Sequence, residues 1–248
     1  MQALAAIGRF AIWSGEVGLR MVRGPWFLRP AARHCWIVVM RCLLPVIAVV
    51  FPFGMVMALQ GLAIFELFGA HRMLASLISV AILRELSPVL ASVLVAAQGG
   101  CSIAAELGSM RIKEELDATD VMAVDSLAYH VVPRVLALTL ACPILNLVGS
   151  IAGLTGGFVT AVFFKGEQAG IFLAELWAFT SPVDLWGGLL KTTIFGAIIG
   201  LVACYHGYNA TGGAAGVGRA VNDTVVYAVL FFITANYFLT SALFGTIG

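Results

Sequence analysis

The chain has 248 residues, of which 61% are hydrophobic and 11% are charged, and its formal net charge at pH 7 is +1. In soluble domains roughly a quarter of the residues are charged, so this chain cannot cover a globule with polar surface. The near-neutral charge argues against nucleic acid as a partner. The composition therefore indicates an all-α integral membrane protein, with room for about five or six helical spans.

The first 24 residues predict an amphipathic helix that lies in the membrane surface. At about 100° per residue, its polar side chains fall within a stripe about 60° wide, and these are Gln2, Arg9, Glu16, Arg20 and Arg23. Such a helix is typical of an interfacial segment. We expect Gly24-Pro25 to end it.

Five later stretches predict membrane helices within a single domain of residues 1–248. They are residues 42–65, 74–105, 135–164, 186–208 and 224–246. A helix over 74–105 would span about 48 Å, well beyond a hydrocarbon core of about 30 Å. We therefore expect this helix to protrude from the bilayer or to break near Pro88.

The lysines and arginines predict the orientation. With the amino terminus in the cytoplasm, the carboxyl terminus lies outside, and the cytoplasmic side holds residues 9, 20, 23, 29, 33, 41, 111, 113, 134 and 219. The outer loops hold Arg72 and Lys165. This bias is typical of the positive-inside rule.

Residues 106–134 form the longest polar stretch between spans, and this topology places it in the cytoplasm. Acidic residues outnumber basic ones in it, so an anionic leaflet repels it. Apolar side chains at helical spacing predict a short helix over 111–123 with an acidic flank. Two interpretations remain open: a docking helix for a cytoplasmic partner, or a solvated linker.

Arg84 and Glu85 are charges at membrane depth. Each needs a partner or water, and because neighbours on a helix point about 100° apart, they do not neutralise each other. The pair could line a cavity near the outer face or anchor the helix by snorkelling to water. We expect Lys191, near the outer end of its span, to be a snorkelling anchor.

Glycines at small-xxx-small spacing permit close helix approach. Gly149 and Gly153 have this spacing in the third span, and Gly196 and Gly200 have it in the fourth. The approach could be between two copies of the chain or within one chain.

No motif of catalysis stands out. The glycine-rich run 212–218 lacks the Gly-Lys-Ser/Thr of a Walker A loop, and no serine at apolar depth has a nearby base. The five cysteines and four histidines are scattered singly, so we expect neither a metal site nor a redox site. The chain is predicted to be a non-catalytic protein without a cofactor of its own.

Three segments carry a resemblance to a known family: LRELSP at 83–88, AAELGSMRIKEELDATDVMAVDSLAYHVVPR at 104–134 and YHGYNATGGAAGVGRAVNDTVV at 205–226. They resemble the MlaE/YrbE permease family, whose members are the membrane subunits of MCE-associated ABC lipid transporters. The similarity covers nearly the whole chain after about residue 40.

The resemblance implies a fold and partners. It implies an interfacial amino-terminal helix, five spans and a coupling helix that docks into a groove of a cytoplasmic ATPase. The ATPase chain would hold ATP and Mg²⁺. A second permease, identical or paralogous, and MCE-domain lipid-binding proteins on the outer face would complete the complex in a bacterial inner membrane. The implied docking residues are Arg111, Lys113, Glu114, Glu115, Leu116, Asp117 and Asp120.

The resemblance also implies a lipid cavity between two permeases. Its lining here would be Met57, Leu59, Ile64, Arg84 and Glu85. The cargo would be a phospholipid, a fatty acid or a sterol, in a direction that no motif specifies. Many members carry Gly-Arg-Ala-Gly where this chain has Ala97-Gln98-Gly99-Gly100, so the role of that arginine does not carry over to Gln98. A different second permease could supply the missing group.

Two alternatives from other classes remain. An ion-coupled secondary transporter or channel would need no ATPase and no acidic docking helix, and the lack of a clear internal repeat weighs against an inverted-repeat transporter. An intramembrane lipid enzyme would require turnover by the isolated chain.

Overall fold

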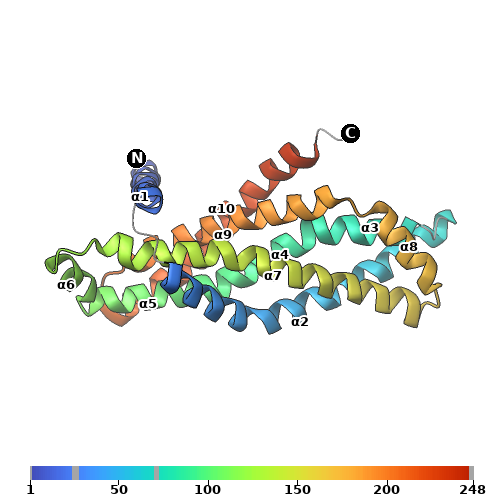
Figure 1. Ribbon diagram of the computed structural model, residues 1–248, viewed down its shortest axis with the longest axis horizontal. Helices are drawn as coiled ribbons and strands as arrows, with labels where there is room; N and C mark the ends of the chain where they lie inside the picture. Colours follow the sequence, from blue (N-terminus) through green and yellow to red (C-terminus); the bar gives the residue numbers. More distant parts are fainter. Residues whose placement is uncertain (1, 24–27, 70–72, 246–248) are drawn as a thin grey trace. The chain divides into compact units, whose positions relative to one another are not determined.

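A computed structural model describes residues 2–23, 28–69 and 73–245 (Figure 1). The described residues contain helices and no strand. The helix end expected at Gly24-Pro25 lies outside them. Five described helical stretches are long and apolar enough to cross a membrane: Leu28–Leu67, Leu74–Ile112, Leu127–Phe164, Pro182–Tyr208 and Gly213–Phe244. The predicted all-α membrane architecture is confirmed.

The helical elements follow one another with few interruptions. Segments marked η are π-helical turns, in which hydrogen bonds skip one residue more than in an α-helix. In chain order the elements are α1 (Gln2–Arg23), α2 (Leu28–Phe68), α3 (Leu74–Ala81), η2 (Ile82–Leu86), α4 (Ser87–Val95), η3 (Ala96–Gly100), α5 (Cys101–Ile112), α6 (Glu115–Val121), η4 (Leu127–Val131), α7 (Val132–Val159), η5 (Thr160–Phe164), α8 (Ala169–Phe179), α9 (Pro182–Tyr208) and α10 (Gly213–Phe244).

The helices extend beyond the apolar stretches that mark them in the sequence. Helix α2 begins at Leu28, well before the predicted start at residue 42, and its first turns carry Arg29, Arg33 and Arg41. Basic side chains are good helix formers. They mark the start of the charge-free stretch at residue 42, but the helix itself begins earlier, at Leu28.

The second span does not break near Pro88. The chain is helical from Leu74 to Ile112, and the π turn Ile82–Leu86 directly precedes the segment that contains this proline. Proline has no N–H to donate to the carbonyl four residues before it. The π turn accommodates this gap, so the helix continues through it.

The chain forms two compact units. The first contains residues 1–39, 95–141 and 195–234, and the second contains residues 40–94, 142–194 and 235–248.

In the first unit, α1 is attached by aromatic rings. The Phe10 ring lies 5.2 Å from that of Tyr205 and 5.8 Å from that of Phe231, measured between centroids. Val17 is fully buried, whereas Ile12 on the same helix is 68% exposed. The helix therefore uses one part of its apolar surface against the protein and leaves another part uncovered, as an interfacial helix does.

In the second unit, α3 and α8 lie side by side (Figure 1). Leu62 of α2, Leu74 and Ile78 of α3, and Phe172 and Leu176 of α8 belong to one buried apolar cluster. Through this cluster, the end of α2 packs against the two short helices α3 and α8.

Glycines bring α2 and α7 into backbone contact within the second unit. A Cβ atom on Gly54 would overlap the carbonyl oxygen of Gly153, and one on Gly156 would overlap that of Phe51. A Cβ atom on Gly149 would lie 2.8 Å from the Ser87 hydroxyl. Gly149 and Gly153 therefore pack within the chain.

We predict that Gly54→Ala lowers the free energy of unfolding by about 1–3 kcal/mol, because the new methyl group meets backbone that cannot move aside. Thermal unfolding of the chain in detergent measures this. The matched control is Gly170→Ala, where no atom lies within 4 Å of the new methyl group. Alanine there should be neutral or stabilising by up to about 1 kcal/mol. Equal effects of the two substitutions would contradict the close-contact interpretation.

Candidate functional site

In the second unit, Arg84 is paired with a buried carboxylate. Its Nε donates to Oδ1 of Asp184 at 2.7 Å, and Asp184 is 1% exposed. The guanidinium also lies 4.6 Å from the centre of the Phe244 ring, a favourable cation–π arrangement. The positive charge is thus compensated, while 30% of the Arg84 side chain remains exposed.

Glu85 is paired with a different residue, Lys191. The Lys191 Nζ donates to Glu85 Oε1 at 3.0 Å and to Thr240 Oγ1 at 2.8 Å. Asn236 Nδ2 and Thr240 Oγ1 donate to Glu85 at 2.9 and 2.8 Å. The prediction that Arg84 and Glu85 do not neutralise each other is therefore confirmed.

Lys191 is not the snorkelling anchor that its position predicted. Its side chain is fully buried, and its third hydrogen bond, at 2.8 Å, goes to the backbone carbonyl of Arg84. In a regular α-helix this carbonyl would accept a hydrogen bond from the residue four positions later, but that residue is Pro88, which has no N–H to donate. Lys191 therefore satisfies both a buried carboxylate and a carbonyl freed by proline.

The sequence interpretation missed Asp184, Asn236 and Thr240. Asn236 and Thr240 are four residues apart, so they share one face of an apolar helix. That spacing was a usable signal. Asp184 stands in the first turn of α9, where a carboxylate is equally well explained by the helix dipole, so only the fold identifies its partner.

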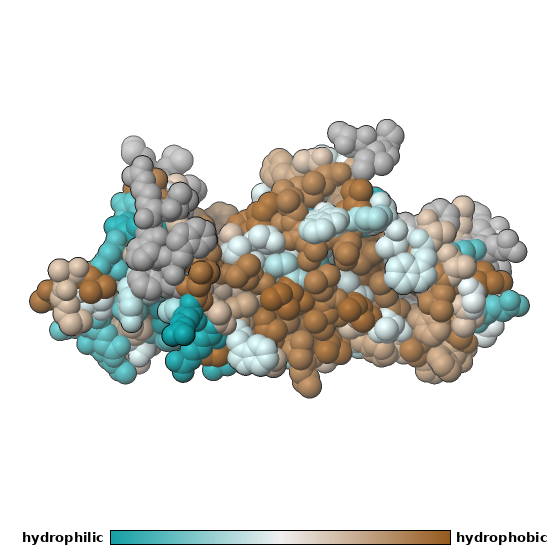
Figure 2. All heavy atoms as spheres, in the orientation of Figure 1, coloured by the Kyte–Doolittle hydropathy of each residue, from teal (hydrophilic) through white to brown (hydrophobic). Residues whose placement is uncertain are grey.

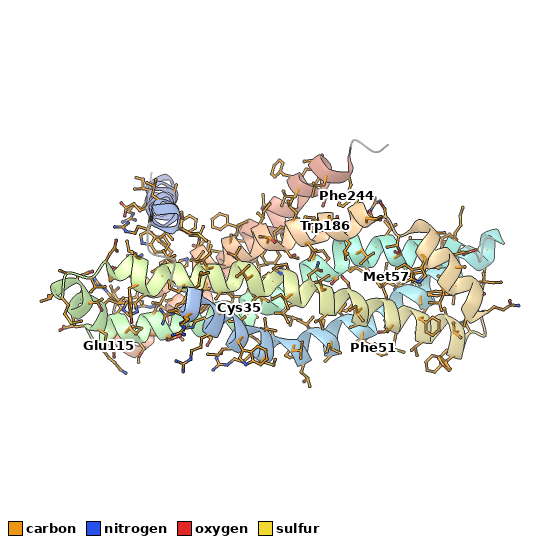
Figure 3. All side chains as sticks on the ribbon, viewed as in Figure 1. Cys35, Phe51, Met57, Glu115, Trp186 and Phe244 are labelled. Atoms are coloured by element: carbon orange, nitrogen blue, oxygen red, sulfur yellow. The ribbon has the colours of Figure 1, made fainter. Side chains whose placement is uncertain are left out.

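The three predicted cavity residues of α2 divide between the two edges of its exposed face. Leu59 is 45% exposed and Ile64 is 53% exposed, while Met57 is half-buried. At about 100° per residue, Met57 and Ile64 lie about 20° apart and Leu59 about 140–160° from them. Figure 3 marks Met57 on α2. Met57 and Ile64 can act together, whereas Leu59 lines the other edge of the exposed face.

In the first unit, the polar segment is not the single helix of residues 111–123 that its spacing predicted. Helix α5 runs on to Ile112, and α6 contains only Glu115–Val121. Between them Glu114 has φ of 60°, and after α6 Ala123 has φ of 59°. These left-handed residues turn the chain at both ends of α6.

The residues of α6 divide into a buried face and an exposed face. Leu116 is fully buried and Thr119 is 8% exposed, so Leu116, a predicted docking residue, instead anchors α6 to its own chain. Arg111 is likewise engaged internally, because its Nη1 donates to Asp117 and its guanidinium lies 5.7 Å from the centre of the Tyr208 ring.

The remaining predicted docking residues lie on the exposed face: Lys113, Glu114, Glu115, Asp117 and Asp120. Two apolar residues that the sequence interpretation overlooked lie beside them. Val121 is 87% exposed and Met122 is 69% exposed. Figure 2 shows hydrophilic and hydrophobic surfaces adjoining around α6, and Figure 3 labels Glu115 at its start.

Asp125 connects this segment to α1. Its Oδ2 accepts a hydrogen bond of 2.6 Å from Arg20 Nε, and its Oδ1 accepts from the backbone N–H groups of Leu127 and Ala128. Burial alone would raise the pKa of the Asp125 carboxyl, but the hydrogen bonds outweigh burial and hold this pKa below its usual range.

Comparison with known proteins gives a consistent result. The family model described as permease MlaE matches residues 31–242. A probable ABC transporter permease protein of Rickettsia bellii is 34% identical over 239 residues, which are 96% of this chain and 92% of that protein. A probable ABC transporter permease protein of Synechocystis is 37% identical over 195 residues, 79% of this chain and 74% of that protein. The intermembrane phospholipid transport system permease protein MlaE of Haemophilus influenzae is 32% identical over 193 residues, 77% of this chain and 74% of that protein.

We predict that Glu85→Gln lowers the free energy of unfolding by about 3–5 kcal/mol, because it leaves the charge of Lys191 buried without its counter-ion. Lys191→Met should cost less, since 39% of the Glu85 side chain is exposed. In the double variant the two costs should not add. Thermal unfolding of all three variants in detergent gives the coupling, with exposed Lys165→Met as the control. Strictly additive effects would rule out the ion pair.

Proposed function

Because the chain belongs to the permease MlaE family, we propose that it is the membrane subunit of an ATP-driven transporter that moves lipid between the bacterial inner membrane and the cell envelope. The main support for this proposal is the match of the MlaE family model to residues 31–242. Relatives across most of this chain are named as ABC transporter permeases. The proposal includes no catalytic residue in this chain, and it assigns ATP and Mg²⁺ to a separate ATPase subunit.

The ATPase would dock on the exposed face of α6. This face carries Glu114, Glu115, Asp117 and Asp120, with Val121 and Met122 at its end. A groove with a basic rim and an apolar floor complements such a surface. The lysine and arginine bias supports a cytoplasmic location for this face, with the amino terminus inside and the carboxyl terminus outside.

Lipid is the proposed cargo. The relative from Haemophilus influenzae is named as a phospholipid transport permease, and α2 has an exposed apolar face that includes Phe53, Val56 and Ile64. Each lipid CH₂ group shielded from water there would contribute about 0.8 kcal/mol. The exposed parts of Arg84 and Glu85 would meet the head group.

A second permease and MCE-domain proteins would complete the transporter. An exposed apolar face on α2 suits a cavity closed by another membrane subunit, identical or paralogous. The MCE-domain proteins would receive or deliver lipid on the outer side. ATP binding would draw the ATPases together, move the docking segments and change the size of the cavity.

We predict that the triple reversal Glu114→Lys, Glu115→Lys, Asp117→Lys abolishes co-purification of the ATPase, because it replaces an acidic surface with a basic one facing a basic groove. Lipid transport should fall with it. The measurement is mass spectrometry of the tagged chain purified from native membranes in mild detergent. Glu66→Lys, on the exposed last turns of α2, is the control. Retention of both ATPase and transport by the triple variant would refute docking at α6.

We predict that Ile64→Glu removes bound lipid from the purified complex, because a carboxylate in an apolar cavity costs about 2.5 kcal/mol or more. Met57→Glu should do the same, since Met57 and Ile64 lie on one face. Trp177→Glu, a highly exposed position on α8, controls for the added charge. Lipid content is measured by mass spectrometry. Normal lipid content in both α2 variants would contradict the proposed cavity.

A further inference from the structure

The first unit contains a polar cavity that has no part in the proposed lipid cavity, and two of its lining residues, Lys113 and Glu115, also lie on the proposed docking face. It has a volume of about 550 Å³ and lies among the start of α2, the end of α5, the start of α6 and the η4–α7 junction. Small-molecule sites are typically about 300–1,000 Å³. Its charged and titratable lining includes His34, Glu106, Lys113, Glu115, His130 and Arg134.

Arg134 lines this cavity and has an unused hydrogen-bond donor. The residue is 5% exposed, its Nη2 donates to Glu106 Oε1 at 2.7 Å, and its Nη1 donates to the carbonyl of His130 at 2.6 Å. Its Nε has no acceptor among the residues that the structure describes. A buried guanidinium N–H without an acceptor is unfavourable, so a ligand oxygen that reached it would be bound tightly.

The other charges of the cavity are incompletely paired. Lys113 Nζ and Glu115 Oε1 are 4.0 Å apart, and their side chains are 66% and 50% exposed. One carboxylate oxygen of Glu106 accepts the hydrogen bond from Arg134, and the Glu106 side chain remains 49% exposed. The lining therefore offers two cationic and two anionic groups whose formal charges cancel, an arrangement that suits a zwitterion better than a simple anion or cation.

We infer that this cavity binds a phosphoethanolamine group. The phosphate oxygens accept hydrogen bonds from Arg134 Nε and Lys113 Nζ, and the ammonium group donates to the carboxylates of Glu106 and Glu115. Two sources share this chemistry: the head group of phosphatidylethanolamine and soluble phosphoethanolamine. The site consists of first-unit residues, so it is separate from Arg84 and Glu85, which belong to the second unit.

Occupancy of this site bears on the docking segment. Lys113 and Glu115 flank Glu114, the left-handed residue between α5 and α6. A ligand held by both of them and by Arg134 of α7 would join three helices. The same zwitterion therefore stabilises the orientation of α6.

The test is binding of soluble probes to the full-length chain in detergent, measured by calorimetry. Lys113→Gln should weaken phosphoethanolamine and inorganic phosphate alike, by about tenfold. Glu115→Gln should weaken phosphoethanolamine by about tenfold and leave inorganic phosphate unchanged or tighter, because only the zwitterion carries an ammonium group. Both side chains are at least half exposed, so neither variant threatens folding.

Glu114→Gln is the matched control, because it removes the same charge one residue away from a side chain that lines the cavity. It should leave the affinity for both probes unchanged. Arg134→Lys, which keeps the charge and removes Nε, should also weaken both probes. Equal effects of Glu115→Gln on the two probes, or of Glu114→Gln and Glu115→Gln on phosphoethanolamine, would overturn the zwitterion assignment.

A second arm identifies the source. The chain is placed in micelles containing phosphatidylethanolamine or phosphatidylglycerol, and retained lipid is counted by native mass spectrometry. Selective loss of phosphatidylethanolamine in Lys113→Gln and Glu115→Gln identifies the lipid head group. Unchanged lipid retention, with weakened binding of soluble phosphoethanolamine, identifies the free compound. If neither source binds the parent chain more tightly than it binds the two variants, the proposal is wrong.

Discussion

The requirement that every charge at membrane depth has a partner shapes the second unit. Arg84 and Glu85 stand next to each other, yet each is compensated from elsewhere, by Asp184 and Lys191. Breaking a buried ion pair destabilises a protein far more than breaking an exposed one does. The two adjacent residues therefore fix α9 at two points against the η2 turn, and Lys191 also reaches α10 through Thr240. The unusual π turn and the proline after it are stable because the same lysine serves the carbonyl that proline frees.

Much of the fold could be predicted from the sequence, because hydropathy over twenty residues is a local property. It located five membrane helices and an amphipathic first helix, but it did not locate their ends. Helix α2 begins at Leu28 because arginines continue a helix as readily as leucines do. The helix near Pro88 continues because a π turn and a distant lysine replace the lost hydrogen bond. The second effect depends on a lysine more than one hundred residues away, which no local pattern identifies.

The candidate sites were less predictable for the same physical reason. The partners of Arg84 and Glu85 lie about one hundred residues away in the chain, and no periodicity links them. Spacing did predict apolar Leu116 on an acidic helix, but whether an apolar residue faces its own chain or a partner depends on packing. Here Leu116 is buried, and two highly exposed apolar residues stand at the end of the helix: Val121, its last residue, and Met122, directly after it. Of the predicted stripe, Leu116 and Thr119 face inward, whereas Ile112 and Ala123 are exposed.

The shortness of α6 determines how a force on it would be transmitted. A seven-residue helix is too short to be stable alone, so its conformation is imposed by Leu116, by the contact of Asp117 with Arg111, and by the hydrogen bond between Thr119 and His130. The segment after it is held by Asp125, which binds Arg20 of α1 and the first N–H groups of the next helix. Left-handed residues bound α6 on both sides, at Glu114 and Ala123, and turn the chain there. A displacement of α6 would therefore act on α5, on α7 and, through Asp125, on α1.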